Sequence, residues 1–260
     1  MSYIQKHFPE NELAIKNKKF KYYLSPLLIK NNFKHGFFTK ISSEIDLSFL
    51  SSKLNLNYRN CVLNQIHSNR IVFGSKTQGL KRAEADGMVC DKDNQNLWIY
   101  TADCMPILFA DKRKRIVAAI HCGRKGLENR IINNLIKIFE NLGTAKEDLL
   151  VAIGPSISKK NYLIDQKTLW EFYKEVNYKE PNSSSKDGGI LFNLKNLVKF
   201  EDKGIMPIDL KKYAHIQLLS QNIPNKNIDI SRLCTFESNH DFYSWRRSKT
   251  FSRQWNFISI

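Results

Sequence analysis

Two histidines and one cysteine in the first half of the chain have side chains that could together hold a metal ion. His67 lies in Asn-Gln-Ile-His, Cys104 in Thr-Ala-Asp-Cys and His121 in Ala-Ala-Ile-His-Cys-Gly. Two imidazoles and a thiolate suit Zn²⁺ and leave a fourth tetrahedral position open, as catalytic zinc sites require. Taken singly, each residue is more typical of a protein core than of a metal site, and none has the short spacing of a structural zinc motif. The set as a whole predicts a metal-dependent enzyme.

Predicted strands place these residues where they could meet. Leu97–Tyr100 and Ile116–Ile120 are apolar runs rich in β-branched and aromatic residues, typical of buried strands. Cys104 and His121 therefore fall at or just after strand ends, where functional residues collect. We expect the segment that carries His67 to join them at one edge of a sheet.

The rest of the chain alternates strand and helix patterns. Gly126–Leu142 has the most regular helical spacing of apolar residues, and Gly143 follows it as a C-terminal cap. This order predicts an α/β (α+β) sandwich, and no linker divides residues 1–260 into domains. The other predicted elements are strands over His35–Thr39, Cys61–Leu63, Ile71–Phe73, Met88–Cys90, Leu149–Ile153, Phe242–Arg246 and Gln254–Ile260, the last two paired, helices over Lys167–Val176 and Leu210–Asn222, and an exposed loop over Asn177–Gly189.

Composition favours a cytoplasmic enzyme over a secreted, membrane or nucleic-acid-binding protein. No apolar run approaches the roughly 20 residues that span a bilayer, and no secretory signal opens the sequence. Five cysteines, an odd number, predict reduced thiols. The formal net charge of +16 comes mostly from dispersed lysines rather than from clustered arginines with aromatics, so nucleic acid is not the expected partner. The charge could instead steer anionic substrates.

Several blocks of sequence resemble the laccase-domain family, whose members are also described as multicopper polyphenol oxidase-like proteins and as purine nucleoside phosphorylases. They occur in the family's order and cover most of the chain. The blocks are Asn64-Gln65-Ile66-His67, Ala85-Asp86-Gly87, Thr101-Ala102-Asp103-Cys104-Met105-Pro106, His121-Cys122-Gly123, Ile153-Gly154-Pro155, Cys234-Thr235 and Phe242-Tyr243-Ser244-Trp245-Arg246-Arg247.

The resemblance implies one zinc ion bound by His67, Cys104 and His121, within layered mixed sheets flanked by helices. It implies phosphorolysis of adenosine, inosine and methylthioadenosine, with phosphate as the second substrate, and deamination of adenosine. Copper-dependent oxidation of phenols has also been attributed to the family. The expected assembly is a monomer or homodimer.

Seven further residues are expected around this site. Asp86 and Asp103 are candidate catalytic carboxylates, beside Cys104, that orient an imidazole or accept a proton. Phosphate requires nearby cations, and the start of a helix also favours anions. The candidate substrate-binding residues are Gln65, Arg124, Lys125, Arg246 and Arg247.

One block departs from the family pattern. The usual Ala-Gly-Trp-Arg-Gly after the metal-binding histidine is here Cys122-Gly123-Arg124-Lys125-Gly126, which loses the tryptophan and replaces its arginine by lysine. Lysine lacks the planar fork that grips phosphate in a bidentate manner. We also expect Cys122 to point away from the metal, because neighbouring strand residues face opposite sides.

Two other enzyme classes remain open. Cys104 and His121 could form a thiolate–base pair for amide chemistry. The resemblance also implies this class, since an amidase role that edits cell-wall precursors has been attributed to some members of the family. A polyphenol oxidase would need additional copper ligands, for which the remaining histidines show no motif.

Overall fold

Two six-stranded mixed sheets form the centre of the protein in the computed structural model, which describes residues 3–15, 18–40, 45–77, 82–178 and 205–260. The first sheet has the order β1 (Glu10–Ile15), β2 (Lys18–Tyr23), β3 (Lys34–Phe38), β14 (Gln254–Ser259), β7 (Gln95–Thr101) and β4 (Arg59–Val62). The second has the order β13 (Ile228–Ile230), β10 (Leu149–Ile153), β8 (Met105–Asp111), β9 (Val117–Cys122), β6 (Gly87–Val89) and β5 (Ile71–Phe73).

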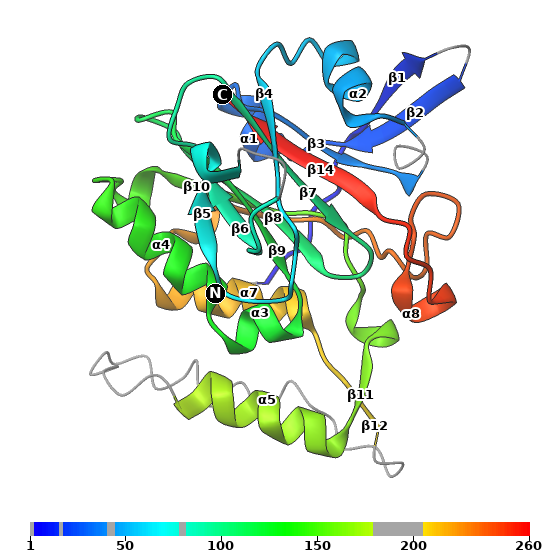
Figure 1. Cartoon of the computed structure of the whole chain (residues 1–260). Coiled ribbons are helices and arrows are strands. Elements are labelled where there is room, and N and C mark those ends of the chain that lie inside the picture. Colours follow the sequence, from blue (N-terminus) through cyan, green and yellow to red (C-terminus); the bar gives the residue numbers. More distant parts are fainter. Residues whose placement is uncertain (1–2, 16–17, 41–44, 78–81, 179–204) are drawn as a thin grey trace.

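The sheets pack face to face, with helices on the outside (Figure 1). Alternation along β8 shows why: Leu108 packs between the sheets, whereas Ile107 and Phe109 pack against the helices. Neighbouring strand residues point to opposite faces, so both faces of this central strand are apolar and buried. The α-helices of the described residues are α1 (Pro26–Lys30), α2 (Leu47–Lys53), α3 (Arg124–Glu128), α4 (Ile131–Asn141), α5 (Gln166–Tyr178), α7 (Leu210–Ser220) and α8 (Trp245–Ser248).

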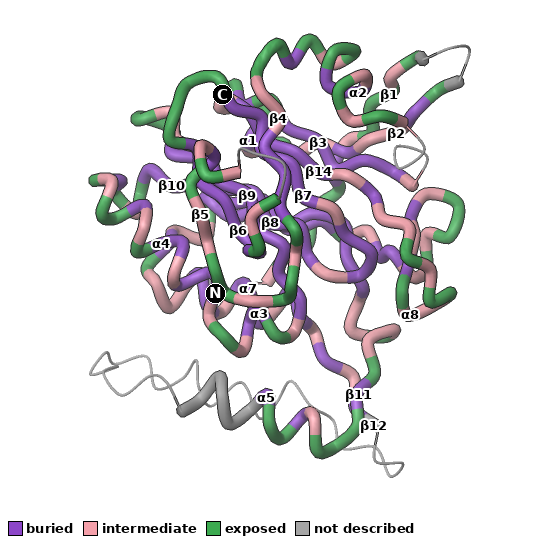
Figure 2. Tube along the Cα trace, in the orientation of Figure 1, coloured by how far each residue is buried: buried purple, intermediate pink, exposed green. Residues whose placement is uncertain are grey.

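Three apolar clusters define the layers. One lies between the sheets, one joins the second sheet to α4 and α7, and one joins the first sheet to α2. The sheets are buried along most of their length, while α2 and the described part of α5 have exposed faces (Figure 2). A short sheet of β11 (Leu163–Asp165) and β12 (Ile205–Pro207) lies beside α5. The predicted layered α/β fold is confirmed.

The predicted helix over Gly126–Leu142 was wrong in one respect, because it is two helices. α3 ends at Glu128, and Arg130 adopts the left-handed conformation with φ 58° before α4 begins. The break allows α3 to pack on α5 and α7 while α4 packs on β5 and α7. Gly143, with φ 76°, follows the end of α4 as expected.

The predicted strand over Phe242–Arg246 was also wrong. Residues 242–244 are irregular and α8 begins at Trp245, with the Ser244 side chain accepting a hydrogen bond from the Arg247 N–H. The predicted C-terminal strand is confirmed as β14, but it pairs with β3 and β7. The predicted loop over Asn177–Gly189 was wrong at its first two residues, which belong to α5, and its remainder lies outside the described residues.

Among the residues described, no helix combines the length and apolar character needed to cross a membrane.

Candidate metal and substrate site

His67, Cys104 and His121, hereafter the ligand cluster, converge where the two sheets meet. His67 lies between β4 and β5, Cys104 in the crossing from β7 to β8, and His121 in β9. Each residue offers one donor atom, and the three atoms lie within 4.8 Å of one another. The Cys104 Sγ is 4.0 Å from the His67 Nε2, and the imidazole centroids are 4.8 Å apart. One ion could therefore contact all three side chains.

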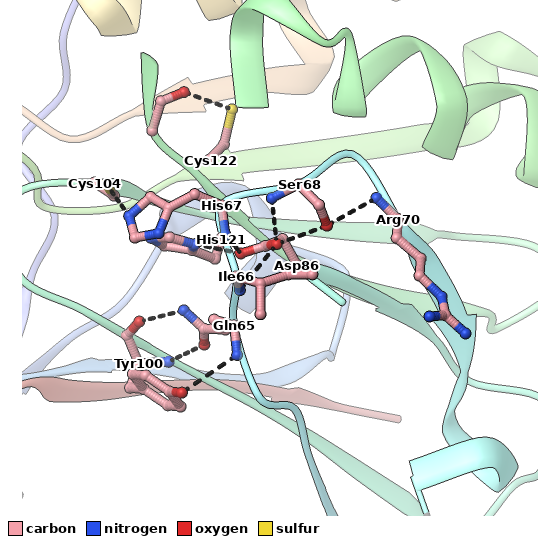
Figure 3. A network of polar contacts seen from close by, with 11 residues as sticks. Gln65, Ile66, His67, Ser68, Arg70, Asp86, Tyr100, Cys104, His121 and Cys122 are labelled. Atoms are coloured by element: carbon pink, nitrogen blue, oxygen red, sulfur yellow. Dashed lines mark hydrogen bonds and ion pairs between the residues drawn. The ribbon is translucent and has the colours of Figure 1, made fainter. Parts of the chain in front are cut away.

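The buried carboxylate of Asp86 holds both histidines (Figure 3). It accepts hydrogen bonds from the backbone N–H groups of Ile66, His67 and Ser68, at 3.2, 3.0 and 2.6 Å. His67 has φ 59°, and this tight turn lets three successive N–H groups converge on one carboxylate. The His121 Nδ1–H also donates to Asp86, over 2.8 Å. That bond leaves Nε2 of His121 available, as in carboxylate–histidine–metal sites.

Electrostatics favour the ligand form of Cys104. Burial alone would raise the pKa of its thiol, but the charge and hydrogen bond of His121 lower that pKa to about 6. Burial would correspondingly lower the pKa of His121, yet Cys104 and Asp86 raise it to about 9. The thiolate is the form that binds metal, and a bound cation replaces the imidazolium proton. The donor set and its charge therefore fit a metal ion.

Gly123 leaves the space in which the sulfur of Cys104 lies. A Cβ atom at Gly123 would lie 2.6 Å from the Cys104 Sγ and 3.9 Å from the His67 Cδ2. Cβ atoms essentially never make contacts under 3.0 Å, so a larger residue at this position would displace the thiolate. Cys122, the preceding residue, packs into the apolar cluster beneath α3 and α4, as predicted from strand alternation.

A cavity of about 700 Å³ opens over the ligand cluster and is rich in cations. It receives five of the seven further residues expected from the sequence: Gln65, Asp103, Arg124, Lys125 and Arg246. The other two expected residues, Asp86 and Arg247, do not line the cavity. Asp86 is hydrogen-bonded to the Nδ1 of His121. The other residues that line the cavity are Ile66, Tyr100, Ala102, Tyr162, Trp245, Lys249, Phe251 and Arg253.

Asp103 connects the ligand cluster to α8. This buried residue has φ 89°, and its carboxylate accepts hydrogen bonds from the Thr235 and Ser244 hydroxyls at 2.7 and 3.0 Å. It also accepts a bond of 2.7 Å from the Arg246 N–H. Asp103 thus fixes the start of α8 relative to Cys104, its neighbour in the chain.

The two adjacent arginines of α8 have different surroundings. The Arg247 guanidinium donates to the backbone carbonyls of Thr235, Phe236 and Phe242, at 2.9, 2.7 and 2.6 Å. The Arg246 guanidinium instead lies 5.0 Å from the centre of the Tyr162 ring, within the cavity. The contacts of Arg247 are therefore structural, while Arg246 faces the site.

Of the remaining expected residues, Gln65 and Arg124 have protein partners. The Gln65 amide donates to the Tyr100 carbonyl and accepts from its N–H, at 2.8 and 2.9 Å, so it extends the hydrogen bonding of β7. Arg124 forms an ion pair with Glu128, one turn further along α3. Lys125 is exposed, lines the cavity and forms no ion pair with the part of the chain that the structure describes.

Several lining residues were missed in the sequence. Tyr162 lies in a separate connection before β11, and Lys249, Phe251 and Arg253 lie between α8 and β14. None belongs to the blocks that carried the resemblance. Trp245 does belong to one, the block Phe242–Arg247, and its place directly before the two expected arginines was the one signal available.

The fold and the site together define a class: layered α/β proteins that have a histidine–cysteine cluster at the base of a cationic pocket. Residues 46–260 match the family described as multi-copper polyphenol oxidoreductase laccase, and the chain belongs to this family.

Named relatives extend the comparison. A purine nucleoside phosphorylase of Campylobacter jejuni is 31% identical over 227 residues, which cover 86% of this chain and 85% of the relative. One of Synechocystis sp. is 30% identical over 182 residues, 67% of each protein. The crystal structure of YlmD from Geobacillus stearothermophilus matches with a TM-score of 0.76 and 21% identity, over 96% of this chain and 99% of that one. The last likeness concerns the fold alone.

Proposed function

We propose that residues 1–260 form one zinc-dependent domain that catalyses phosphorolysis of purine nucleosides. The observation that carries this proposal is the ligand cluster at the base of a pocket with several cations. Relatives named purine nucleoside phosphorylase support the reaction class. The proposed substrates are inorganic phosphate with adenosine, inosine or methylthioadenosine.

In this reaction a phosphate oxygen forms a bond to C1′ of the ribose, the bond from C1′ to the purine nitrogen breaks, and that nitrogen gains a proton. Arg246 and Lys125 would hold the phosphate, since its negative charge requires nearby cations. A zinc ion on the ligand cluster would supply a Lewis acid and a positive charge at the base of the pocket. Asp86 would keep His121 oriented through the Nδ1–H hydrogen bond.

The departure at Arg124 and Lys125 preserves positive charge while removing an aromatic ring. Arg124 is paired with Glu128, which reduces its charge toward a ligand, whereas Lys125 lines the same cavity. We infer that Lys125 contributes a point charge to phosphate binding at this turn, and that the guanidinium fork is supplied by Arg246.

The test is to measure the metal content of the purified protein, to incubate it with adenosine, with and without phosphate, and to separate the products by chromatography. Adenine and ribose 1-phosphate that form only with phosphate would support the proposal. Inosine would reveal deamination at the same site. Removing the metal with a chelator and restoring Zn²⁺ or Cu²⁺ separately would identify the metal that supports turnover. No product in any of these conditions would overturn the proposal.

The second candidate is an amidase, and one observation favours it. Cys104 lies beside His121, which Asp86 orients, so a thiol, a base and a carboxylate follow one another. This arrangement resembles that of cysteine nucleophiles activated by histidine. A metal ion bound to Cys104 in one-to-one ratio would exclude this candidate, because the sulfur would then be a ligand.

A further inference from the structure

Two large aromatic side chains are exposed in the cavity, although neither belongs to the ligand cluster. Trp245 is 39% exposed and Phe251 is 87% exposed, and both line the cavity. Their ring centroids are 5.6 Å apart with an interplanar angle of 58°. An exposed aromatic ring in a pocket gains free energy when a ligand covers it.

The backbone around Phe251 is held in place, so its exposure is a built feature of the pocket. The Arg253 Nη1 donates to the carbonyls of Thr250 and Ser252, the residues on either side of Phe251, at 2.7 and 2.9 Å. The Ser252 N–H also donates to the Thr250 hydroxyl over 3.1 Å. These bonds keep the turn in the shape that leaves the ring of Phe251 uncovered.

Cations surround the indole of Trp245. The Lys249 Nζ lies 5.5 Å from the ring centroid, and the Arg253 Cζ lies 5.8 Å from it. Both residues line the cavity. The pair of rings therefore offers apolar faces bordered by positive charge, which suits a flat heteroaromatic group attached to an anionic or hydrogen-bonding part.

The position of the rings is coupled to the ligand cluster. Asp103 precedes Cys104 and accepts hydrogen bonds from the Ser244 hydroxyl and the Arg246 N–H, the two residues that flank Trp245. The aromatic pair and the ligand cluster are thus fixed relative to each other through one side chain. A ligand that stacks on the rings can present its remaining part to the metal site.

We propose that Trp245 and Phe251 form the base-binding platform of this pocket, on which the purine ring of the substrate stacks. This inference rests on the proposed function for the identity of the base. It accounts for the aromatic ring lost at Arg124, since the ring needed to bind a base is supplied by α8 and the turn after it. The platform determines affinity for the base and does not take part in binding phosphate.

The test measures binding without turnover. Free adenine and, separately, inorganic phosphate are titrated by calorimetry into the metal-loaded wild-type protein and into Phe251→Ser. Phe251 is mostly exposed, so this variant is expected to fold normally. Stacking on one aromatic residue predicts that adenine binds about tenfold more weakly to the variant, with phosphate binding unchanged.

Tryptophan fluorescence supplies a second measurement. Adenine should quench the wild-type emission, Trp245→Phe should remove most of that quenching, and Trp170→Phe should retain it. Trp170 is a matched control because it is 62% exposed on α5 and does not line the cavity. Equal adenine affinity in wild type and Phe251→Ser, or no adenine binding to wild type, would overturn the platform. Adenine binding that depends on Phe251, in a protein that does not cleave adenosine, would support the platform and refute the phosphorylase.

Discussion

The ligand cluster and the α8 wall face one cavity but are held by different kinds of structure. The α8 wall comprises Trp245, Arg246, Lys249, Phe251 and Arg253. The ligand cluster lies at strand ends and is fixed by Asp86, whose carboxylate is fully buried. The α8 wall belongs to a four-residue helix and the turn after it, and is fixed by Asp103 from another part of the chain.

This difference suggests a division between the two sides of the pocket. Strands with many neighbours are rigid and hold a metal geometry, whereas short helices and turns tolerate changes of side chain. We therefore expect substitution of Asp86 to affect metal binding and substitution of Asp103 to affect substrate binding.

The largest effect is expected from Cys104→Ala. Loss of the thiolate should remove the metal and reduce adenosine phosphorolysis at least about a thousandfold, since a catalytic metal contributes several kcal/mol. Metal content by mass spectrometry and product chromatography measure the two effects. Cys122→Ala is the control, because its sulfur packs under α3 and should not affect metal content. Full activity in Cys104→Ala would refute both the metal site and the thiol alternative.

Gly123→Ala should nearly match that effect without removing any ligand. The new Cβ would lie 2.6 Å from the Cys104 Sγ, so the sulfur must move and metal affinity should fall about a hundredfold. Gly126→Ala, in the helix that Gly123 caps, is the matched control, since the atoms nearest to its new Cβ would lie at 3.4 Å. Equal metal affinity in the two variants, measured by competition with a chelator, would show that the sulfur is not held at this position.

Asp86→Asn and Asp103→Asn test the division directly. Asp86→Asn weakens the hydrogen bond that orients His121, and metal affinity should fall about 10–100-fold. Asp103→Asn should retain the metal and raise the KM for adenosine, because the start of α8 loses charged acceptors for its N–H and hydroxyl groups. If Asp103→Asn lost metal as readily as Asp86→Asn, the two sides of the pocket would not be independent.

The smallest effects on metal and substrate binding are expected from the adjacent arginines. Arg246→Ala should raise the KM for phosphate about tenfold with little change in melting temperature, since one charged contact contributes about 1.5 kcal/mol. Arg247→Ala should instead lower the free energy of unfolding by about 2–4 kcal/mol, because three backbone carbonyls lose their donor. Thermal melting and steady-state kinetics of both variants separate these roles. The opposite assignment would mean that Arg247 turns toward the substrate.

Much of the ligand cluster could be predicted because its signals are local. His121 and Cys104 lie at or beside apolar strands whose composition is readable from the chain, and β10 and β5 were predicted at their observed bounds. The errors lie where tertiary contacts override local pattern. Phe242–Arg246 has the aromatic composition of a strand, but Asp103 accepts bonds from Ser244 and Arg246 and so favours a helix start there.

The sequence by itself determined the candidate ligand types, the central strands and the direction of Cys122 away from the ligand cluster, because residue chemistry and strand alternation are properties of neighbouring positions. Only the tertiary structure decided that Asp86 forms hydrogen bonds with both histidines and that Asp103 accepts hydrogen bonds from the start of α8. It also decided that Arg246 faces the cavity while Arg247 binds backbone carbonyls. These features depend on contacts between residues far apart in the chain, and spacing along the sequence carries no record of which side chains meet. The pairing of Trp245 with Phe251 also depends on the tertiary structure. The two rings meet because α8 and the turn held by Arg253 face the same pocket.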